Sequence, residues 1–489
     1  MSIGLVRTSL VAVALLLVGC TNTTTTQTNR NAPATPSASP GSSPIAAKPD
    51  EAKANAQVLT FPILDAFLTD PGFSDALKSR TRLTDDEVSK LKELAHAETS
   101  KLNENSAGTT EGETANARAE AQEKVGALIG PEKTEQLAAL VRERWNDGSG
   151  AAPAAAGTKP KVTDTPMTAE EFEVMEPNSV PSDSRVVVNA PAFRMDVFEN
   201  GQLVKSYKVG IGYPQFPLPT ALRKARTIIF NPTWTPPDEP WVSKMKNVSV
   251  GQVVEAGSAL NPLGPIKIPI GAPSLIHGGK PLAKIGTFAS HGCVGLTTPQ
   301  VRDFAKLLAR IGGSQLTDAA LERYAQDKTQ TRTLKLAHDV PVELRYETIV
   351  VEDGKLHIYR DVYDQDSNTE EELRSVLEKY NVKLEDLSQP EQDQIFDALG
   401  QMAGKSTKKI VRPAAAAATP GPSPSPSPSS SASPSPSPAM GKNAKATKKP
   451  VRGKNLKEIV IEVAALNGKG YPAPVDLDTG AGRASKKVK

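Results

Sequence analysis

The sequence contains little cysteine and no long hydrophobic run. Only two cysteines, Cys20 and Cys293, occur among the 489 residues, so Cys293 has no internal disulfide partner if Cys20 is modified. No stretch of 18 or more apolar residues is present, which excludes an ordinary membrane-spanning helix. The formal net charge of +3 is too close to balance to predict a nucleic-acid partner. With 38% hydrophobic residues and 41 prolines, a sizeable part of the chain is expected to lie outside any packed core.

The N-terminal residues predict export. Arg7 precedes an apolar segment, Leu10 to Leu17, of the length of a signal-peptide core. Leu17-Val18-Gly19-Cys20 then resembles a bacterial lipobox, which implies cleavage after residue 19 and acylation of Cys20. Acyl chains on one residue anchor a soluble domain to a bilayer. We therefore expect residues 1–19 to be a signal peptide and the mature protein to be a periplasmic, lipid-anchored envelope protein. The outer membrane is the expected site, with the inner membrane and an ordinary secretory signal as alternatives.

Composition divides the first third of the chain into a tether, a helical module and a linker. Residues 20–53 are polar and predict a disordered tether. Residues 54–146 predict helices: Thr84 and Glu87 form a potential capping box, and Pro131 can open a later helix. This module faintly resembles the LTxxQ helices of periplasmic stress chaperones, but a plain helical hairpin or bundle is the simpler interpretation. Residues 147–166 predict a second linker.

Residues 167–364 predict a mainly β domain. Short β-rich runs alternate with turn residues, and Asn200-Gly201 between two such runs indicates a hairpin. One amphipathic helix is expected at Pro299 to Ile311. The runs that predict strands are 185–188, 194–198, 203–209, 227–230, 266–270 and 342–351.

The C-terminal part predicts one folded extension and two unfolded segments. Residues 365–410 are expected to form a helical extension, with helical structure over 365–403, and residues 411–440 a Pro/Ser-rich linker. Residues 441–489 read as a basic tail, either a solvated arm or a weak electrostatic attachment to anionic polymer or lipid. Within it, Leu456 to Leu466 fits a short helix or strand. The sequence carries no signal for oligomeric state.

One cluster of residues carries potential chemistry. Cys293 lies within 16 residues of two of the chain's five histidines, His277 and His291, and glycines flank all three. A thiol needs a base or a cation nearby to become a nucleophile. A zinc site is an alternative, but one cysteine and two histidines supply only the minimum of three ligands. An inert buried cysteine is the other alternative.

The spacing in this cluster resembles the YkuD-type L,D-transpeptidase family. His277 is followed by twelve residues and then by Ser290-His291-Gly292-Cys293, as in that catalytic domain. The resemblance implies a β-sandwich with one packed helix after the cysteine, separate from the N-terminal α-helical module and the disordered linkers. Residues 192–201 also resemble the opening hairpin of this family. Supporting similarities to its larger Gram-negative branch occur at 230–234, 261–264 and 341–363.

The resemblance also implies roles for the cluster. His277 would be the base, oriented by the carbonyl of Gly278, and Cys293 the nucleophile. Backbone N–H groups of Gly292 and Cys293 would form an oxyanion hole. His291 would line the site, with a structural role and a chemical one both open, and Ser290 would fix the turn.

The implied reaction joins peptidoglycan stem peptides without a metal or organic cofactor. The thiolate attacks the L-centre of diaminopimelate in a tetrapeptide stem and releases D-Ala. An amine then takes the acyl group, and the sequence does not choose between a stem peptide, a protein, a D-amino acid or water as acceptor. With water, the enzyme would be an L,D-carboxypeptidase or cysteine peptidase.

One residue departs from the family pattern. The family usually has Arg or Asn two residues after the cysteine, and this chain has Gly295. Arg302 or Lys284 are candidates to replace it. The departure keeps open a catalytically degenerate, lipid-anchored wall-binding protein.

Overall fold

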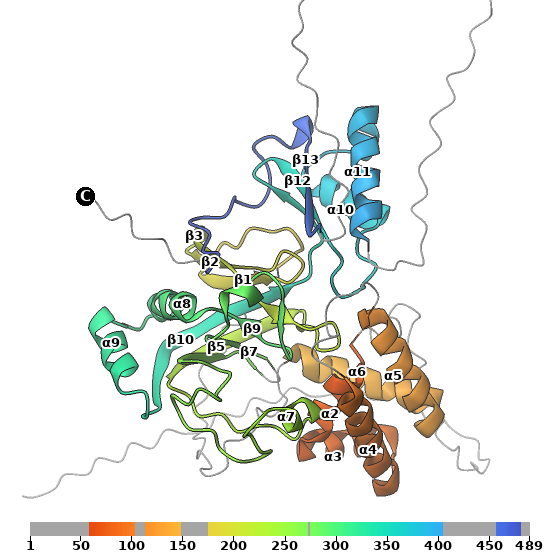
Figure 1. Ribbon diagram of the computed structural model, residues 1–489. Helices are drawn as coiled ribbons and strands as arrows, with labels where there is room; N and C mark the ends of the chain where they lie inside the picture. Colours follow the sequence, from red (N-terminus) through yellow and green to blue (C-terminus); the bar gives the residue numbers. More distant parts are fainter. Residues whose placement is uncertain (1–57, 103–112, 148–174, 272–273, 404–455, 481–489) are drawn as a thin grey trace, which may run out of the picture. The chain divides into compact units, whose positions relative to one another are not determined.

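The computed structural model describes residues 58–102, 113–147, 175–271, 274–403 and 456–480 (Figure 1). The expected signal peptide, Cys20, the tether 20–53 and the Pro/Ser-rich linker 411–440 lie outside these residues, as does nearly all of the linker 147–166. Among the described residues, no helix has both the length and the apolar character needed to span a bilayer.

The described residues of the N-terminal module form helices joined by short connections. The predicted capping box at Thr84 and Glu87 is confirmed, and both of its hydrogen bonds form at the start of one helix. Asp70 caps another by accepting from the Gly72 N–H at 2.9 Å. Leu91, Val125 and other apolar residues of all the helices share one buried core. The helices are α2 (Phe61–Leu68), α3 (Pro71–Thr81), α4 (Asp85–Lys101), α5 (Glu113–Ile129) and α6 (Pro131–Asp147).

The domain that follows is built on one curled, eight-stranded sheet. The Asn200-Gly201 hairpin is confirmed, with φ of 50° and 79° at its two turn residues. The strand order is β3-β2-β1-β10-β5-β6-β7-β9. The strands are β1 (Arg185–Asn189), β2 (Arg194–Glu199), β3 (Gln202–Lys208), β5 (Ala221–Phe230), β6 (Ile266–Pro269), β7 (Leu275–His277), β9 (Val294–Gly295) and β10 (Arg332–Arg345). A small parallel pair, β4 (Ile211–Gly212) and β8 (Phe288–Ser290), lies beside the sheet's β9 end.

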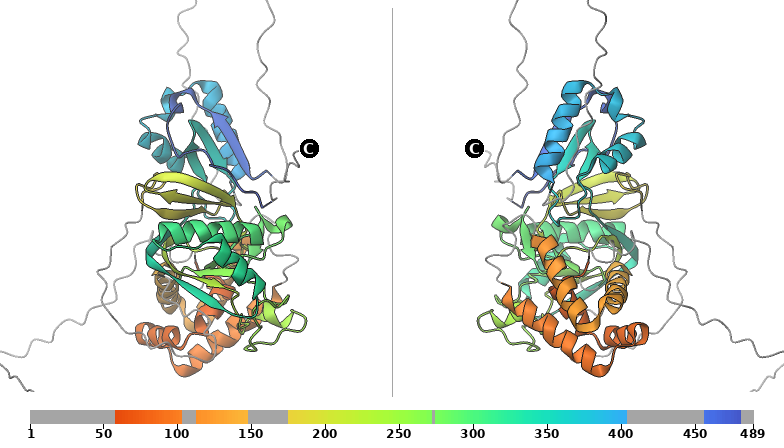
Figure 2. Two further views of the ribbon diagram at one scale, coloured as in Figure 1. Left: turned by 90° about the vertical axis from the view of Figure 1, so that its left-hand side faces the viewer. Right: turned by 90° about the vertical axis from the view of Figure 1, so that its right-hand side faces the viewer.

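Helices cover part of this sheet. The helix predicted after the cysteine is α8 (Thr298–Ile311), and Thr297 and Gln300 form a capping box at its start. Its buried face, with Val301, Phe304 and Leu308, belongs to the sheet core. Figure 2 shows the ribbon of this domain from two further sides. A further helix that was not predicted, α9 (Asp318–Gln326), follows it and is capped by Thr317. A one-turn helix, α7 (Pro240–Ser243), and a 3-10 turn, Leu282–Lys284, lie in the loops.

The C-terminal part forms a second, three-stranded sheet. Its strands are β11 (Ile349–Glu352), β12 (Lys355–Tyr359) and β13 (Glu458–Glu462). Residues 365–403, which were expected to be helical, form two helices, α10 (Glu370–Lys379) and α11 (Gln389–Met402). Turns of 3-10 helix occur at 384–386 and 464–466. A solvated arm is wrong for residues 456–480, because Ile461 and Val463 are buried against the other strands and helices.

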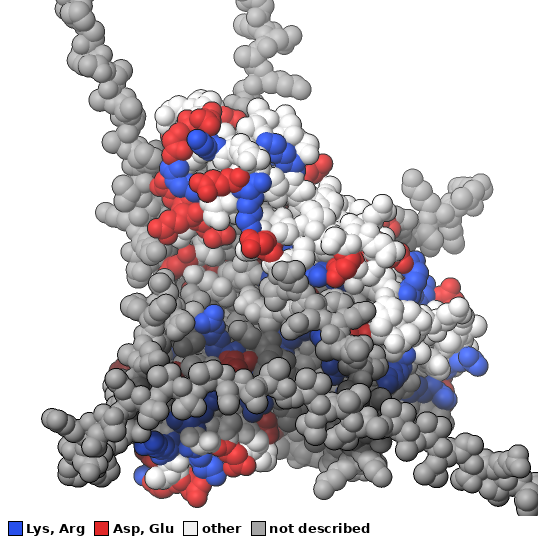
Figure 3. Space-filling model, turned by 180° about the vertical axis from the view of Figure 1, so that it is seen from behind, with Lys and Arg blue, Asp and Glu red and all other residues white. Residues whose placement is uncertain are grey.

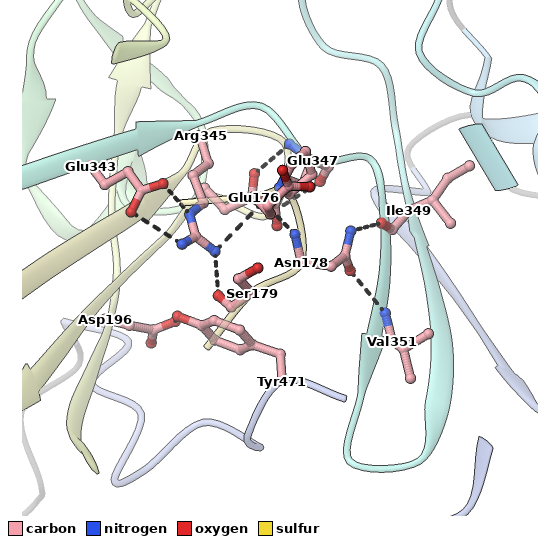
Figure 4. Close-up of polar contacts among 12 residues, drawn as sticks. Glu176, Asn178, Ser179, Asp196, Glu343, Arg345, Glu347, Ile349, Val351 and Tyr471 are labelled. Atoms are coloured by element: carbon pink, nitrogen blue, oxygen red, sulfur yellow. Dashed lines mark hydrogen bonds and ion pairs between the residues drawn. The ribbon is translucent and has the colours of Figure 1, made fainter. Parts of the chain in front are cut away.

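Buried charges connect the two sheets (Figure 4). Arg345, at the end of β10, contacts Glu343 at 3.1 Å and Glu347 at 3.5 Å. The uncharged side chain of Asn178, from the segment before β1, binds the backbone of β11: it donates to the Ile349 carbonyl and accepts from the Val351 N–H. Buried charges are tolerated only when paired and hydrogen-bonded, so these contacts fix the connection between β10 of the main sheet and β11 of the second sheet. On the described part of the face in Figure 3, acidic and basic side chains are interspersed.

Candidate active site

Two short parallel strands place the histidine and the cysteine. In the β7–β9 pair, Ile276 lies opposite Val294, and His277 lies opposite Gly295. Ile276 and Val294 are fully buried in the sheet core. Because successive side chains on a strand point to opposite faces, His277 and Gly295 share the other face. Cys293 directly precedes β9 and is two residues before Gly295, so the same alternation places it on the face of His277 and Gly295.

His277 is held as a neutral base. Its side chain is buried, and Nδ1 lies 2.8 Å from the Gly278 carbonyl oxygen. Because a carbonyl can only accept, Nδ1 carries the proton in this contact and Nε2 is the unprotonated nitrogen of the neutral ring. Burial lowers the pKa of His277 to about 3, and the charge of Lys280 acts in the same direction. The backbone carbonyls of Gly278 and Leu263 oppose this shift.

The turn before the cysteine is closed by Ser290. Its hydroxyl donates to the Cys293 carbonyl oxygen at 2.5 Å and accepts from the Cys293 N–H at 3.0 Å. This N–H was expected in an oxyanion hole, but in this structure Ser290 already uses it. Gly292 adopts φ of 90°, and its carbonyl accepts from Ser274 at 2.7 Å. Of the two expected donors, the Gly292 N–H is therefore the one not assigned to Ser290.

The Cys293 thiol is partly exposed and protonated at rest. Burial raises its pKa above the usual value, and the charge of Glu239 adds to that shift. The backbone at Leu275 and the charge of Lys280 act in the opposite direction. A thiol of raised pKa beside a neutral imidazole can react only if the proton is transferred as the nucleophile attacks.

A comparison with protein families agrees with this geometry. Residues 183–332 match the model of the L,D-transpeptidase catalytic domain, YkuD. These residues form a YkuD domain. The match covers β1 to β9, α8 and α9 and ends where β10 begins. No curated protein is similar to the chain at a significant level.

Several solved structures that are similar to part of this chain are L,D-transpeptidases. The Mycobacterium smegmatis enzyme is 13% identical, with 33% of this chain and 58% of that chain covered and a TM-score of 0.20. L,D-transpeptidase 3 of Mycobacterium tuberculosis is also 13% identical, with 33% and 60% covered and a TM-score of 0.20. The catalytic domain of the Enterococcus faecium enzyme is 14% identical, with 34% and 100% covered and a TM-score of 0.20. The chain spans about half of the first such enzyme, at 49% of its length.

Aromatic rings enclose the second histidine of the YkuD domain. His291 stacks on Trp241 of α7, with ring centroids 4.2 Å apart and an angle of 8° between planes. Phe216 and Tyr213 meet its ring edge-on at 4.6 and 5.4 Å. This packing fastens the α7 loop beside Cys293, which gives His291 a clear structural role.

Sequence analysis missed the acidic group of this site. Glu239 precedes α7 and accepts from the Trp241 indole N–H at 2.5 Å. Burial raises the pKa of Glu239 to about 7, and Asp65 of α2 contributes in the same direction. No local pattern marks Glu239, because the titratable groups that it affects or that affect it, Cys293 and Asp65, are more than 50 residues away in the chain.

Two glycine-containing segments, 261–264 and 278–279, pack together next to His277. The Gly278 N–H donates to the Ile266 carbonyl at 3.1 Å, which extends the β6–β7 ladder past His277. A Cβ atom on Gly264 would lie 2.6 to 2.7 Å from the backbone of Gly278 and Gly279. Such distances are sterically forbidden, so the 261–264 segment can reach His277 only with glycine at 264.

Gly264→Ala should therefore weaken both folding and thiol chemistry. The overlap has backbone atoms on both sides, so relief requires moving the residues that carry His277. We expect a loss of about 1–3 kcal/mol in unfolding free energy and slower acylation of Cys293. Gly251→Ala is the matched control. Both glycines have a positive φ, 64° at Gly264 and 73° at Gly251, but nothing lies within 4 Å of a Cβ added at Gly251. If Gly264→Ala and Gly251→Ala had equal effects on the melting temperature and on the acylation rate, Gly264 would have no role in positioning His277.

The described residues contain no group of three or more His, Cys, Asp or Glu side chains arranged to hold a metal ion. Around Cys293, the groups that the structure brings together are instead an imidazole, a lysine, a carboxyl group and aromatic rings. These groups can transfer protons, and the thiol can accept an acyl group.

Proposed function

We propose that the protein is a peptidoglycan L,D-transpeptidase with Cys293 as nucleophile and His277 as base. The observation that carries the proposal is the β7–β9 register, which puts His277 opposite Gly295, two residues from the partly exposed thiol. The Nδ1 contact with Gly278 supports it further, because this contact leaves Nε2 as the proton acceptor.

The proposed reaction has two acyl-transfer steps. The Cys293 sulfur attacks the carbonyl carbon at the L-centre of diaminopimelate while its proton passes to His277 Nε2. The tetrahedral intermediate collapses to a thioester, and the departing D-Ala amine takes that proton. An acceptor amine then attacks the thioester and gives its proton to His277, which returns it to the sulfur as the thiolate leaves. The product is a new amide, and the thiol is regenerated.

The location of this activity belongs to the proposal as well. A signal peptide over 1–19 and acylation of Cys20 would place the domain in the periplasm, anchored to the outer membrane. Peptidoglycan stem peptides lie in the same compartment. Similarity to the larger Gram-negative branch of the family supports this placement through the segments at 230–234 and 261–264.

Purified tetrapeptide muropeptides provide the direct test. The full chain should convert them to 3–3 crosslinked dimers with release of one D-Ala per crosslink. Liquid chromatography and mass spectrometry detect both products. Tripeptides and D-Ala without dimers would replace the proposal by a carboxypeptidase. No conversion at all, with stem peptides or with added D-amino acids, would favour a wall-binding protein without catalysis.

A further inference from the structure

Gly295 leaves a space in the active site that a lysine fills. A Cβ atom on Gly295 would lie 2.7 Å from Cγ of Lys280, 3.0 Å from its Cε and 3.3 Å from its Cδ. The methylenes of Lys280 therefore run directly over the Gly295 α-carbon. Any side chain at 295 would compete with Lys280 for this volume.

The backbone on both sides of this contact is fixed. The Lys280 N–H donates to the Leu296 carbonyl at 3.0 Å, and Gly295 exchanges two hydrogen bonds with Gly210, at 2.8 and 2.9 Å. Lys280 itself is half-buried. Its stem is thus held against β9, and its position follows from the strand register rather than from a chance surface rotamer.

From this position, one charge reaches both reacting groups. The Lys280 ammonium lowers the pKa of the Cys293 thiol and also that of His277. The charged group that acts on the thiol in the other direction is Glu239, from the α7 loop. The two imidazoles near the thiol are His277, which is neutral, and His291, which packs among aromatic rings.

The two cations suggested by sequence analysis lie elsewhere. Arg302 pairs with Glu322 at 3.1 Å, between α8 and α9. Lys284 is exposed and lies over the ring of Tyr213, with Nζ 5.7 Å from the ring centroid. Neither contributes to the pKa shift of the thiol.

We propose that Lys280 is the electrostatic partner of the nucleophile: it occupies the space above Gly295 and stabilises the Cys293 thiolate as the proton leaves. This inference rests on the proposed function and deepens it, since it assigns a new residue to the same site. In the reaction, Lys280 neither transfers a proton nor forms a covalent bond. It favours the charged sulfur over the neutral thiol and disfavours a charged imidazole, so the proton on His277 is readily passed to the leaving amine.

The pH dependence of Cys293 alkylation tests this role without any substrate. The full chain is treated with iodoacetamide across a range of pH, and adducts on Cys293 are followed by peptide mapping to separate them from Cys20. Lys280→Met keeps the length of the side chain and removes its charge. We expect the alkylation profile to move to higher pH and the rate at pH 7 to fall about tenfold, since a tenfold change corresponds to one pKa unit. Lys280→Arg should retain the wild-type profile.

Lys284→Met is the matched control, because it removes a lysine from the same loop and should leave the profile unchanged. Gly295→Ala provides an independent arm. Its Cβ would displace Lys280, so it should raise the thiol pKa in the wild-type background but have little effect when combined with Lys280→Met. Thermal melts show whether each variant is folded. An unchanged profile in folded Lys280→Met, or equal effects of Gly295→Ala in both backgrounds, would overturn the inference.

The alkylation test and the muropeptide test can fail separately. If the protein makes no crosslinks but Lys280→Met moves the pH profile of Cys293 alkylation, the role of Lys280 stands and the proposed reaction does not. A protein that makes crosslinks with an unshifted thiol keeps the reaction class and loses the assignment of Lys280.

Discussion

Cys293→Ala should abolish every product of acyl transfer while leaving the protein folded. Removal of a covalent nucleophile lowers turnover on the order of 10⁴-fold or more, because the remaining groups only bind and polarise the substrate. The turn should survive, since Ser290 holds it through the backbone N–H and carbonyl of residue 293 and not through the sulfur. Muropeptide mass spectrometry should show neither dimers nor released D-Ala. Intact-protein mass after treatment with a carbapenem should show no adduct, whereas the wild-type chain should gain one.

Cys20→Ala is the matched control, as it removes the other cysteine of the chain. It should lose the lipid anchor but keep crosslinking and the carbapenem adduct in vitro. Cys293→Ser offers a second variant with a side chain of similar size and should be equally inactive, because the weakly acidic hydroxyl needs a stronger base than His277. Crosslinked dimers from either folded Cys293 variant would show that the nucleophile lies elsewhere.

Local signals in the sequence were sufficient for much of the YkuD domain. The Asn200-Gly201 hairpin and the helix after Cys293 each depend on residues within a few positions, and both were predicted. The spacing from His277 to Cys293 is likewise a local property. Such features follow from turn chemistry, capping and periodicity, which operate over one or two turns of chain.

Features that depend on distant pairing were not predictable from one sequence. The packing of Lys280 over Gly295 needs the β7–β9 register, and stacking of Trp241 on His291 joins residues 50 positions apart. The strand β13 pairs with β12, about 100 residues earlier in the chain. Because this partner is distant, the basic and polar residues around β13 led to the prediction of a basic tail. In each case the residue type was visible, but its partner is set by tertiary structure.

His277→Ala should slow acylation of Cys293 by about 10³-fold at pH 7. General-base catalysis contributes 10²–10⁴-fold, and this thiol depends on it because burial keeps its pKa above the usual value. Without the imidazole, the rate should depend on the fraction of thiolate formed by solvent alone. The deficit should therefore narrow as pH rises, which stopped-flow measurement of carbapenem acylation from pH 6 to 10 can follow. His338→Ala is the control, as this histidine bonds the Ile311 carbonyl at 2.9 Å at the end of α8.

The same variant should also change the acid stability of the fold. His277 has a folded pKa of about 3 against an ordinary value of 6.5, so between these values the unfolded chain binds one more proton at this site. Stability from this site is thus complete above pH 6.5 and is lost as pH falls toward 3. His277→Ala removes that proton linkage, so its melting temperature should depend less on pH in this window than that of the wild type. A variant with unchanged acylation and an unchanged acid profile would mean that His277 is neither buried as a neutral group nor used as the base, because both results follow from one imidazole held without charge beside the thiol.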